Sequence, residues 1–276
     1  MNLLRRLASL PVLRAVLLQP RVRRALAGIL ALRFLRAAFL TTSPLRFVVA
    51  ELVTRRGEIT TWPLRDGGTI TLTHRRDLEA FHELMVGGEY EPPPELRART
   101  SAPRRILDVG GNIGMFAHWA SRRWPDAQIT SFEPDPANVE VFRAGLTDGG
   151  RIDLVAGAAM TQTGHAVLGA GEGAGRQVEL ADHPVPGSVP AIDIFEHLVD
   201  ADLVKVDIEG GEWPILRDPR MSGLGPTTWV IEFHRVGAPS LPAVDAARDL
   251  FTAAGFTVGP ARLNYWGHGT LWAWKD

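Results

Sequence analysis

From residue 105 onwards, short apolar runs typical of buried strands alternate with segments whose apolar positions recur at helical spacing. This alternation predicts an α/β fold in which a doubly wound, mostly parallel sheet of Rossmann-like type is connected by helices. The last two expected strands have no helix between them, which predicts an antiparallel hairpin at the C-terminal end of the sheet. The expected strands are 105–110, 128–134, 152–160, 165–171, 203–210, 228–234, 255–259 and 268–274, and the expected helices are 115–123, 136–146, 191–198, 211–217 and 242–254.

A shorter β pattern precedes this alternation. Segments 58–64 and 69–74 flank the turn-forming residues 65–68, which predicts a β-hairpin, and a helix is expected at 77–85. Within the second half, the polar stretch 161–190 is rich in glycine and proline and is expected to be a mobile loop. We therefore divide the chain into an arginine-rich helical extension, a leading segment of hairpin and helix, and a main domain. Their boundaries are 1–50, 51–100 and 101–276.

Residues 1–50 contain nine arginines and no acidic residue. Apolar residues surround these arginines, but no uncharged run is longer than about nine residues, whereas a membrane span needs roughly 18 to 20. We therefore expect neither a transmembrane helix nor a signal peptide there. The pattern predicts two or three short helices separated by Pro11 and Pro20, docked on the rest of the chain or in a homodimer. Peripheral contact between residues 1–40 and an anionic membrane is the alternative.

Composition narrows the class of protein. A hydrophobic fraction of 45% over 276 residues supports one substantial core. The absence of cysteine excludes disulfides, thiolate metal sites and cysteine nucleophiles, and favours a cytoplasmic location. The net charge is −1, which leaves −10 for residues 51–276. Because this part is acidic and lacks an Asn/Asp-Pro-Pro-aromatic signature after the fourth core strand, we do not expect a nucleic-acid partner.

A glycine-rich turn follows the first core strand. Asp108, Gly110, Asn112 and Gly114 end the strand and open the next helix, which is the usual arrangement where a nucleotide-binding sheet approaches its ligand. A dinucleotide fingerprint aligned on Gly110 would need glycines where Asn112 and Met115 stand, so an NAD-dependent oxidoreductase is disfavoured. The carboxylate of Asp108 suits the cationic aminoacyl end of S-adenosylmethionine better than a pyrophosphate.

The second core strand ends in Glu133, 19 residues after Gly114. At that spacing a carboxylate reaches the ribose hydroxyls of a bound nucleoside, and both can donate hydrogen bonds to it. Capping of the next helix together with Pro134 and Asp135 is the purely structural alternative. Small residues around Ala158, at the end of the third strand, would leave a slot for an adenine ring or could equally serve tight packing.

Acidic residues also follow the fourth and fifth core strands. Asp207, Glu209 and Glu212 come after the fourth, and Glu232 and His234 lie on one face of the fifth. Because the ends of parallel strands meet at one edge of the sheet, these side chains predict an active-site crevice beside the nucleotide.

The chain resembles the FkbM family of methyltransferases in four segments that follow one another in the family's order. They are DVGGNIGMF, SFEPDPANV, LVKVDIEGGEWPIL and VIEFH. The resemblance extends from the hairpin near residue 58 to the C-terminus, and KVDIEG is its most specific part. Gly111 replaces the alanine usual in the family. Residues 1–50 lie outside the resemblance.

The resemblance implies a class I methyltransferase fold, S-adenosylmethionine as the cofactor, and mostly O-methylation of secondary metabolites, sugars or glycolipids. It implies cofactor contacts at Asp108, Gly110, Asn112, Glu133, Asp135 and Asn138. It implies an acceptor side lined by Asp207, Glu209, Glu212, Glu232 and His234. Asp207, at the end of the fourth strand, is also within the expected reach of the cofactor.

The reaction expected from this constellation is methylation of a hydroxyl group on a small-molecule or glycan acceptor. His234, neutral near pH 7 at its ordinary pKa of roughly 6.5, is the expected base, and Asp207 or Glu209 would orient it or replace it. Alternatively, Mg²⁺ held by Asp207 and Glu232 would lower the pKa of the hydroxyl. N-methylation and a non-catalytic scaffold with the same fold remain the competing hypotheses.

Overall fold

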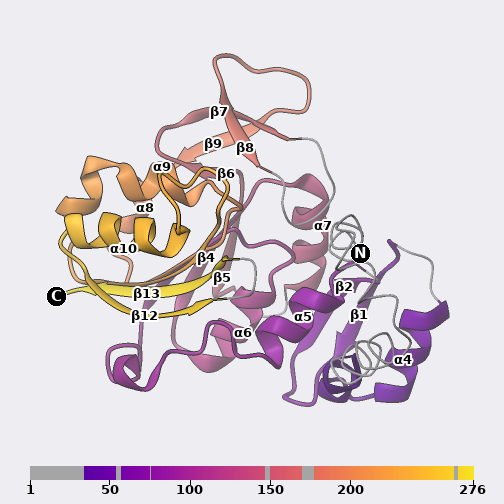
Figure 1. The fold of residues 1–276 in the computed structure, drawn as a ribbon. Helices are drawn as coiled ribbons and strands as arrows, with labels where there is room; N and C mark the ends of the chain where they lie inside the picture. The colour runs from indigo at the N-terminus through magenta and orange to yellow at the C-terminus, as the bar shows by residue number, and fades with distance from the viewer. Residues whose placement is uncertain (1–33, 54–56, 75, 147–149, 170–176, 264–266) are drawn as a thin grey trace, which may run out of the picture.

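The computed structural model describes residues 34–53, 57–74, 76–146, 150–169, 177–263 and 267–276. Its centre is a seven-stranded sheet with the order β12-β13-β11-β10-β3-β4-β5 (Figure 1). The five strands from β11 to β5 are parallel, and β13 is antiparallel to both β11 and β12. The strands are β3 (Arg105–Val109), β4 (Gln128–Glu133), β5 (Ile152–Ala156), β10 (Leu203–Val206), β11 (Thr227–Phe233), β12 (Thr257–Leu263) and β13 (Gly269–Lys275). The predicted fold class and its C-terminal hairpin are confirmed.

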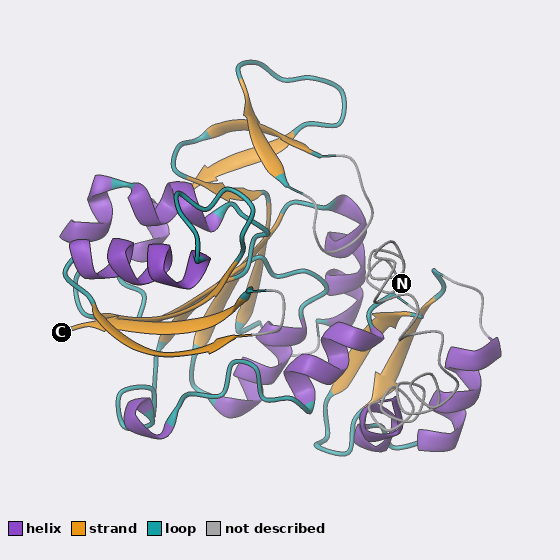
Figure 2. Cartoon of the chain, viewed as in Figure 1, coloured by secondary structure: helices purple, strands orange, loops and turns teal. Residues whose placement is uncertain are grey.

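Helices cover both faces of this sheet (Figure 2). Neighbouring residues of the strands from β13 to β5 enter two different hydrophobic cores, as Ile106 and Leu107 of β3 do. One core contains α6 (Met115–Arg123) and α7 (Pro136–Gly145), and the other contains α8 (Phe195–Leu198), α9 (Glu212–Arg217) and α10 (Ala243–Ala253). Because both faces are buried, the central strands are apolar almost throughout, which is why the sequence identified them.

The hairpin predicted ahead of the sheet is present. β1 (Ile59–Pro63) pairs with β2 (Thr69–Thr73), and α5 (Leu78–Met85) follows. A short 3₁₀ helix, Pro94–Leu96, leads into β3, and another, Pro219–Gly223, follows α9. Residues 34–40 are helical and α4 (Pro44–Val53) lies on the outer side of the hairpin (Figure 1). The helices expected around Pro11 and Pro20 lie outside the described residues.

A second, four-stranded sheet corrects three expectations. β6 (Ala158–Met160), β9 (Val189–Asp193), β7 (Gly164–Leu168) and β8 (Val178–Ala181) pair in that order. The run 152–160 is therefore two strands in two sheets. The strand expected at 165–171 is present as β7, and the expected loop 161–190 also contains β8. The helix expected at 191–198 begins only at Phe195, because residues 189–193 form β9. Proline inside that short run obscured its strand character.

None of the helices in the described ranges combines the length and the hydrophobicity that crossing a bilayer requires.

Candidate active site

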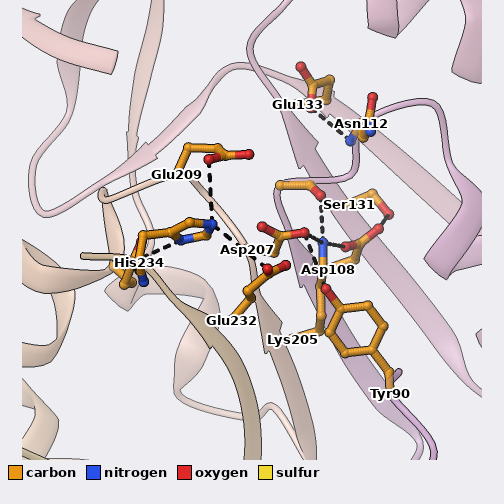
Figure 3. Close-up of polar contacts among 12 residues, drawn as sticks. Tyr90, Asp108, Asn112, Ser131, Glu133, Lys205, Asp207, Glu209, Glu232 and His234 are labelled. Carbon is orange, nitrogen blue, oxygen red and sulfur yellow. Dashed lines mark hydrogen bonds and ion pairs between the residues drawn. The ribbon is translucent and has the colours of Figure 1, made fainter. Parts of the chain in front are cut away.

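The predicted site residues come together at one edge of the seven-stranded sheet. β3, β4, β10 and β11 are parallel, so their carboxyl ends meet there. Figure 3 shows these side chains. Glu133 contacts Asn112, His234 lies beside Glu209 and Glu232, and a third set of side chains surrounds Lys205.

The glycine-rich turn depends on backbone conformations that other residues rarely adopt. Gly110 has φ +90°, and a Cβ added there would lie 1.9 Å from the carbonyl oxygen of Asp207. Gly114 has φ +88°, and its added Cβ would lie 2.5 Å from the Phe142 ring. The turn is thus held tightly between the end of β10 and helix α7. Among the described residues, positive φ occurs outside glycine only at Asn112 (+49°) and Glu209 (+53°), both in this site.

Glu133 is buried and organises the turn around it. Its Oε2 accepts a hydrogen bond from the Asn112 backbone N–H at 2.8 Å, and its Oε1 accepts one from the Asp135 N–H at 2.8 Å. Burial raises the pKa of the Glu133 carboxyl to about 7 despite these hydrogen bonds, which favour its charged form. The carboxylate therefore lies beside the glycine-rich turn, as the sequence predicted, but it also carries structural hydrogen bonds.

The neighbours of Glu133 offer a further acceptor. Asn138 donates to Glu133 Oε1 at 3.3 Å, and its buried Oδ1 has no hydrogen-bond partner within the described part of the chain. Asp135 caps α7 by accepting from the Ala137 N–H at 2.9 Å. Pro134 stands between the two acids, and Ala158 is buried in β6. An acceptor without a donor beside Glu133 suits a ligand that carries hydroxyl or amino hydrogens.

Asp108 has a different environment from the one expected. It is 0% exposed, accepts a hydrogen bond from Ser131 Oγ at 2.9 Å, and lies 3.1 Å from Lys205 Nζ. Lys205 also donates to the Gly110 carbonyl at 2.6 Å. The charge of Asp108 is thus balanced by Lys205, and its contact with the ammonium group of a cofactor stays a prediction.

Sequence reasoning did not single out Lys205 or Tyr90. Burial lowers the pKa of Lys205, but the negative charges of Asp108 and Asp207 outweigh this and raise it overall. Tyr90 donates to Asp207 Oδ2 at 3.2 Å, and the same oxygen lies 3.8 Å from Lys205 Nζ. Lys205 could have been identified from the sequence because it is a lone lysine inside the apolar run LVKV, and a buried charge requires partners.

Carboxyl groups crowd the acceptor side. The charge of Asp207 and burial raise the pKa of Glu232 to about 9, while burial and the charges of Asp207 and Glu83 raise that of Glu89 to about 7. Glu89 and Glu232 line a pocket of about 300 Å³ together with Arg262, which donates to the Gly88 carbonyl at 2.9 Å. Its other lining residues are His82, Glu83, Gly87, Leu263, Gly269 and Thr270.

His234 is 4% exposed and is oriented by a buried carboxylate. Glu212 Oε1 accepts from the His234 backbone N–H at 2.8 Å and lies 3.2 Å from its Nδ1. The Nε2 atom therefore faces Glu209 at 3.4 Å and Glu232 at 4.0 Å. Burial lowers the pKa of His234, but the hydrogen bond and the charge of Glu212 outweigh this and raise it to about 9. This corrects the expectation that His234 is neutral near pH 7.

Asp207, Glu232 and His234 could also hold a metal ion. Each offers one ligand atom, and these atoms lie within 4.8 Å of one another. The structure thus adds His234 to the pair of carboxylates that the sequence suggested. The hydrogen bond of Glu212 to the other ring nitrogen of His234 is the kind of outer contact that orients metal-binding histidines.

Residues 108–258, more than half of the chain, match the family described as the methyltransferase FkbM domain. The chain belongs to the FkbM methyltransferase family. The match runs from Asp108 into β12 and so contains Glu133, Asp207 and His234. This confirms the resemblance found in the sequence motifs, and Tyr90 and Glu89 contribute to the site from outside the matched range.

Two curated proteins share shorter segments with this FkbM family member. "Methyltransferase 1" of Beauveria bassiana is 44% identical over 41 residues, which cover 15% of this chain and 16% of that protein. The type II methyltransferase M.XamI of Xanthomonas campestris pv. amaranthicola is 35% identical over 74 residues, which cover 25% of this chain and 14% of that protein. The matched segments thus span only a small part of either relative.

Solved structures that are similar to this chain have low sequence identity to it. Fibrillarin of Aeropyrum pernix, solved with natively bound S-adenosyl-L-methionine, is 15% identical with a TM-score of 0.41, over 78% of this chain and 93% of that chain. The O-methyltransferase TomG of Streptomyces achromogenes, solved with the same cofactor, is 18% identical with a TM-score of 0.38, over 71% and 86% of the two chains. At these values the likeness says nothing about the acceptor of this protein.

Proposed function

We propose that this FkbM family member transfers a methyl group from S-adenosylmethionine to a hydroxyl oxygen of a small-molecule or glycan acceptor. The observation that carries the proposal is the meeting of two groups at one sheet edge. The turn Gly110–Gly114 lies against Glu133, which suits a nucleoside, and the cluster of Asp207, Glu232 and His234 lies at the ends of the neighbouring strands.

The residues around Glu133 fit the nucleoside part of this cofactor. Ribose hydroxyls donate hydrogen bonds, and the Glu133 carboxylate together with the unpaired Asn138 Oδ1 supplies acceptors. When bound, S-adenosylmethionine would supply an electrophilic methyl group on its sulfonium. The protein's own contribution is to align the acceptor oxygen with that methyl group and to remove the hydroxyl proton.

His234 is the proton acceptor in this proposal, with Asp207 and Glu209 beside it. Its raised pKa of about 9 means that the neutral imidazole is a minor form at pH 7 and a strong base when present. We expect the methylation rate to rise with pH towards about 9. His234→Asn should lower kcat by a factor of about 10² to 10⁴ and remove this rise, measured with radiolabelled S-adenosylmethionine. A pH-rate profile unchanged in the variant would exclude His234 as the base.

A divalent cation is the second arrangement for the same step. Asp207, Glu232 and His234 would hold it, and it would lower the pKa of the acceptor hydroxyl. Oxygen-rich Mg²⁺ sites rarely include imidazole, so Mn²⁺ should be assayed beside Mg²⁺. Loss of activity after EDTA treatment and its return with either ion would support this arrangement, and full activity in EDTA would refute it.

The cofactor half of the proposal is tested by calorimetric titration with S-adenosylmethionine. Glu133→Gln should weaken binding by about 2 kcal/mol, or roughly 30-fold, because a charge-assisted hydrogen-bond pair is lost. Glu140→Gln is the matched control, since Glu140 is exposed on α7 close by. The absence of binding in the wild-type protein would contradict the proposal. Binding without methyl transfer to any hydroxyl or amine acceptor would instead favour a non-catalytic protein.

A further inference from the structure

The two helices at the edge of the molecule, residues 34–40 and α4, expose a cluster of apolar side chains. Of the twelve large apolar residues exposed in the described part of the chain, six belong to these helices. They are Leu35 (44% exposed), Phe39 (61%), Leu45 (77%), Val49 (47%), Leu52 (65%) and Val53 (74%). We call this set the outer apolar face. Figure 1 shows α4 on the side of the hairpin away from α5.

The outer apolar face has the spacing of an amphipathic helix. In α4 the exposed residues stand at positions i, i+4, i+7 and i+8 from Leu45, which places them on one side. The opposite side is already used for folding. Phe47 is fully buried, 5.0 Å from the Trp62 ring, and the buried Glu51 carboxylate accepts a hydrogen bond from His74 Nδ1 at 2.6 Å. α4 therefore carries two apolar stripes, of which the core needs one.

Cationic residues accompany the outer apolar face. Arg36 and Arg46 are exposed among its members, and Arg46 lies over the Trp62 ring at 5.8 Å. From residue 33 to 56 the sequence has five arginines and one acid, Glu51, which is buried against His74. Residues 1–50 as a whole hold nine arginines and no acid. An exposed apolar stripe flanked by arginine is the composition that binds at the interface of an anionic bilayer.

We infer that the outer apolar face docks on an anionic lipid surface, with Leu45, Val49 and Leu52 entering the interface and the arginines meeting the headgroups. Charge selects this occupant over the alternatives. The same face of a second copy, or the arginine-rich residues before 34, would bring more arginines against Arg36 and Arg46 with no exposed acid among residues 33–56 to balance them. An anionic surface balances them all. The inference is independent of the methyl transfer proposed above.

Vesicle co-sedimentation of the full chain tests the inference. We expect binding to phosphatidylglycerol vesicles that weakens as salt is raised, and little binding to phosphatidylcholine alone. Leu45→Gln combined with Leu52→Gln should reduce binding at least tenfold, because two apolar side chains no longer favour the interface. Arg36→Gln should reduce it about fivefold. All three residues are exposed, so these variants should fold normally.

The matched control is Val199→Gln combined with Leu241→Gln, two apolar residues that are 69% and 59% exposed elsewhere on the molecule. This variant should bind vesicles as the wild type does. Equal binding by the Leu45/Leu52 variant, or equal binding to both lipids, would overturn the inference. Light scattering gives a further check. If the wild type is a dimer, the Leu45/Leu52 variant is a monomer and vesicle binding is unchanged, the face binds a second copy of the chain and the inference is overturned.

Discussion

Lys205 illustrates how one buried charge connects the fold to the site. It stands in the middle of the sheet, where β10 pairs with β3. Its ammonium group contacts Asp108, the Gly110 carbonyl and the Asp207 carboxylate. The side chains of Lys205 and Asp108 are 4% and 0% exposed, so neither charge is solvated by water. Their mutual attraction offsets the desolvation of each, and the pair holds the glycine-rich turn against the end of β10.

We therefore expect Lys205→Met to destabilise the protein by about 3 to 5 kcal/mol, because Asp108 would be left buried without a counter-charge. Urea denaturation followed by circular dichroism measures this. The double variant Asp108→Asn with Lys205→Met is the control, and it should recover part of the lost free energy of unfolding. A double variant as unstable as the sum of its two single variants would show that the pair is not coupled.

Glu133 predicts an opposite pH dependence for stability and for cofactor binding. Burial raises its pKa from 4.5 to about 7, so its contribution to stability is present below about pH 4.5 and is lost as the pH rises through about 7. Ribose hydroxyls would donate to the charged form, so the affinity for S-adenosylmethionine should fall about tenfold per pH unit below about 7. Calorimetry on either side of pH 7 measures this, and Glu133→Gln should lack the dependence.

At the scale of elements, the turn between β3 and α6 requires glycine for two reasons: its backbone φ is positive, and the end of β10 lies too close for a side chain. Gly110 and Gly150 both have positive φ, +90° and +87°, but only Gly110 has atoms close to the place of a Cβ. Comparing substitutions at Gly110 and Gly150 therefore separates the backbone strain of a positive φ from the steric overlap of a new Cβ with the end of β10.

Gly110→Ala should abolish S-adenosylmethionine binding and lower the melting temperature sharply, because the added Cβ would overlap the Asp207 carbonyl. Gly150→Ala should cost only the backbone strain of about 1 to 3 kcal/mol and leave cofactor affinity unchanged. Thermal melts and calorimetry of both variants provide the measurement. Similar effects of the two substitutions would mean that the close approach to β10 is unimportant.

At the scale of the whole molecule, the hairpin and the sheet share one hydrophobic core. Trp62 of β1, Phe81 of α5, Ile106 of β3 and Trp272 of β13 belong to the same cluster of buried side chains. The boundary at residue 100 proposed from the sequence therefore crosses a continuous core, and we expect residues 51–100 to unfold together with the sheet.

Hydrogen exchange at equilibrium tests this expectation. The amides of β2 should be protected to the same free energy as those of β3 and β10, because no smaller unit would open independently. Exchange of β2 at a much lower free energy would establish the hairpin as a separate folding unit.

The sequence by itself determined the order of strands and helices in the main sheet, the hairpin, the glycine-rich turn and the residues at the strand ends. These are local properties: apolar periodicity, turn residues and spacing are readable within a few positions of the chain. The motifs around Asp108, Glu133, Asp207 and His234 were sufficient to identify the family. Strands 189–193 and 178–181 were missed because their pairing, rather than their composition, makes them strands.

Only the tertiary structure decided how the charges are distributed over these residues. It paired Asp108 with Lys205, brought Tyr90 to Asp207 across 117 positions of sequence, and surrounded His234 with carboxylates that raise its pKa. It also turned one of two apolar stripes of α4 outwards. Desolvation and Coulomb interactions depend on distances between segments remote in the chain, and for that reason no local pattern could have supplied them.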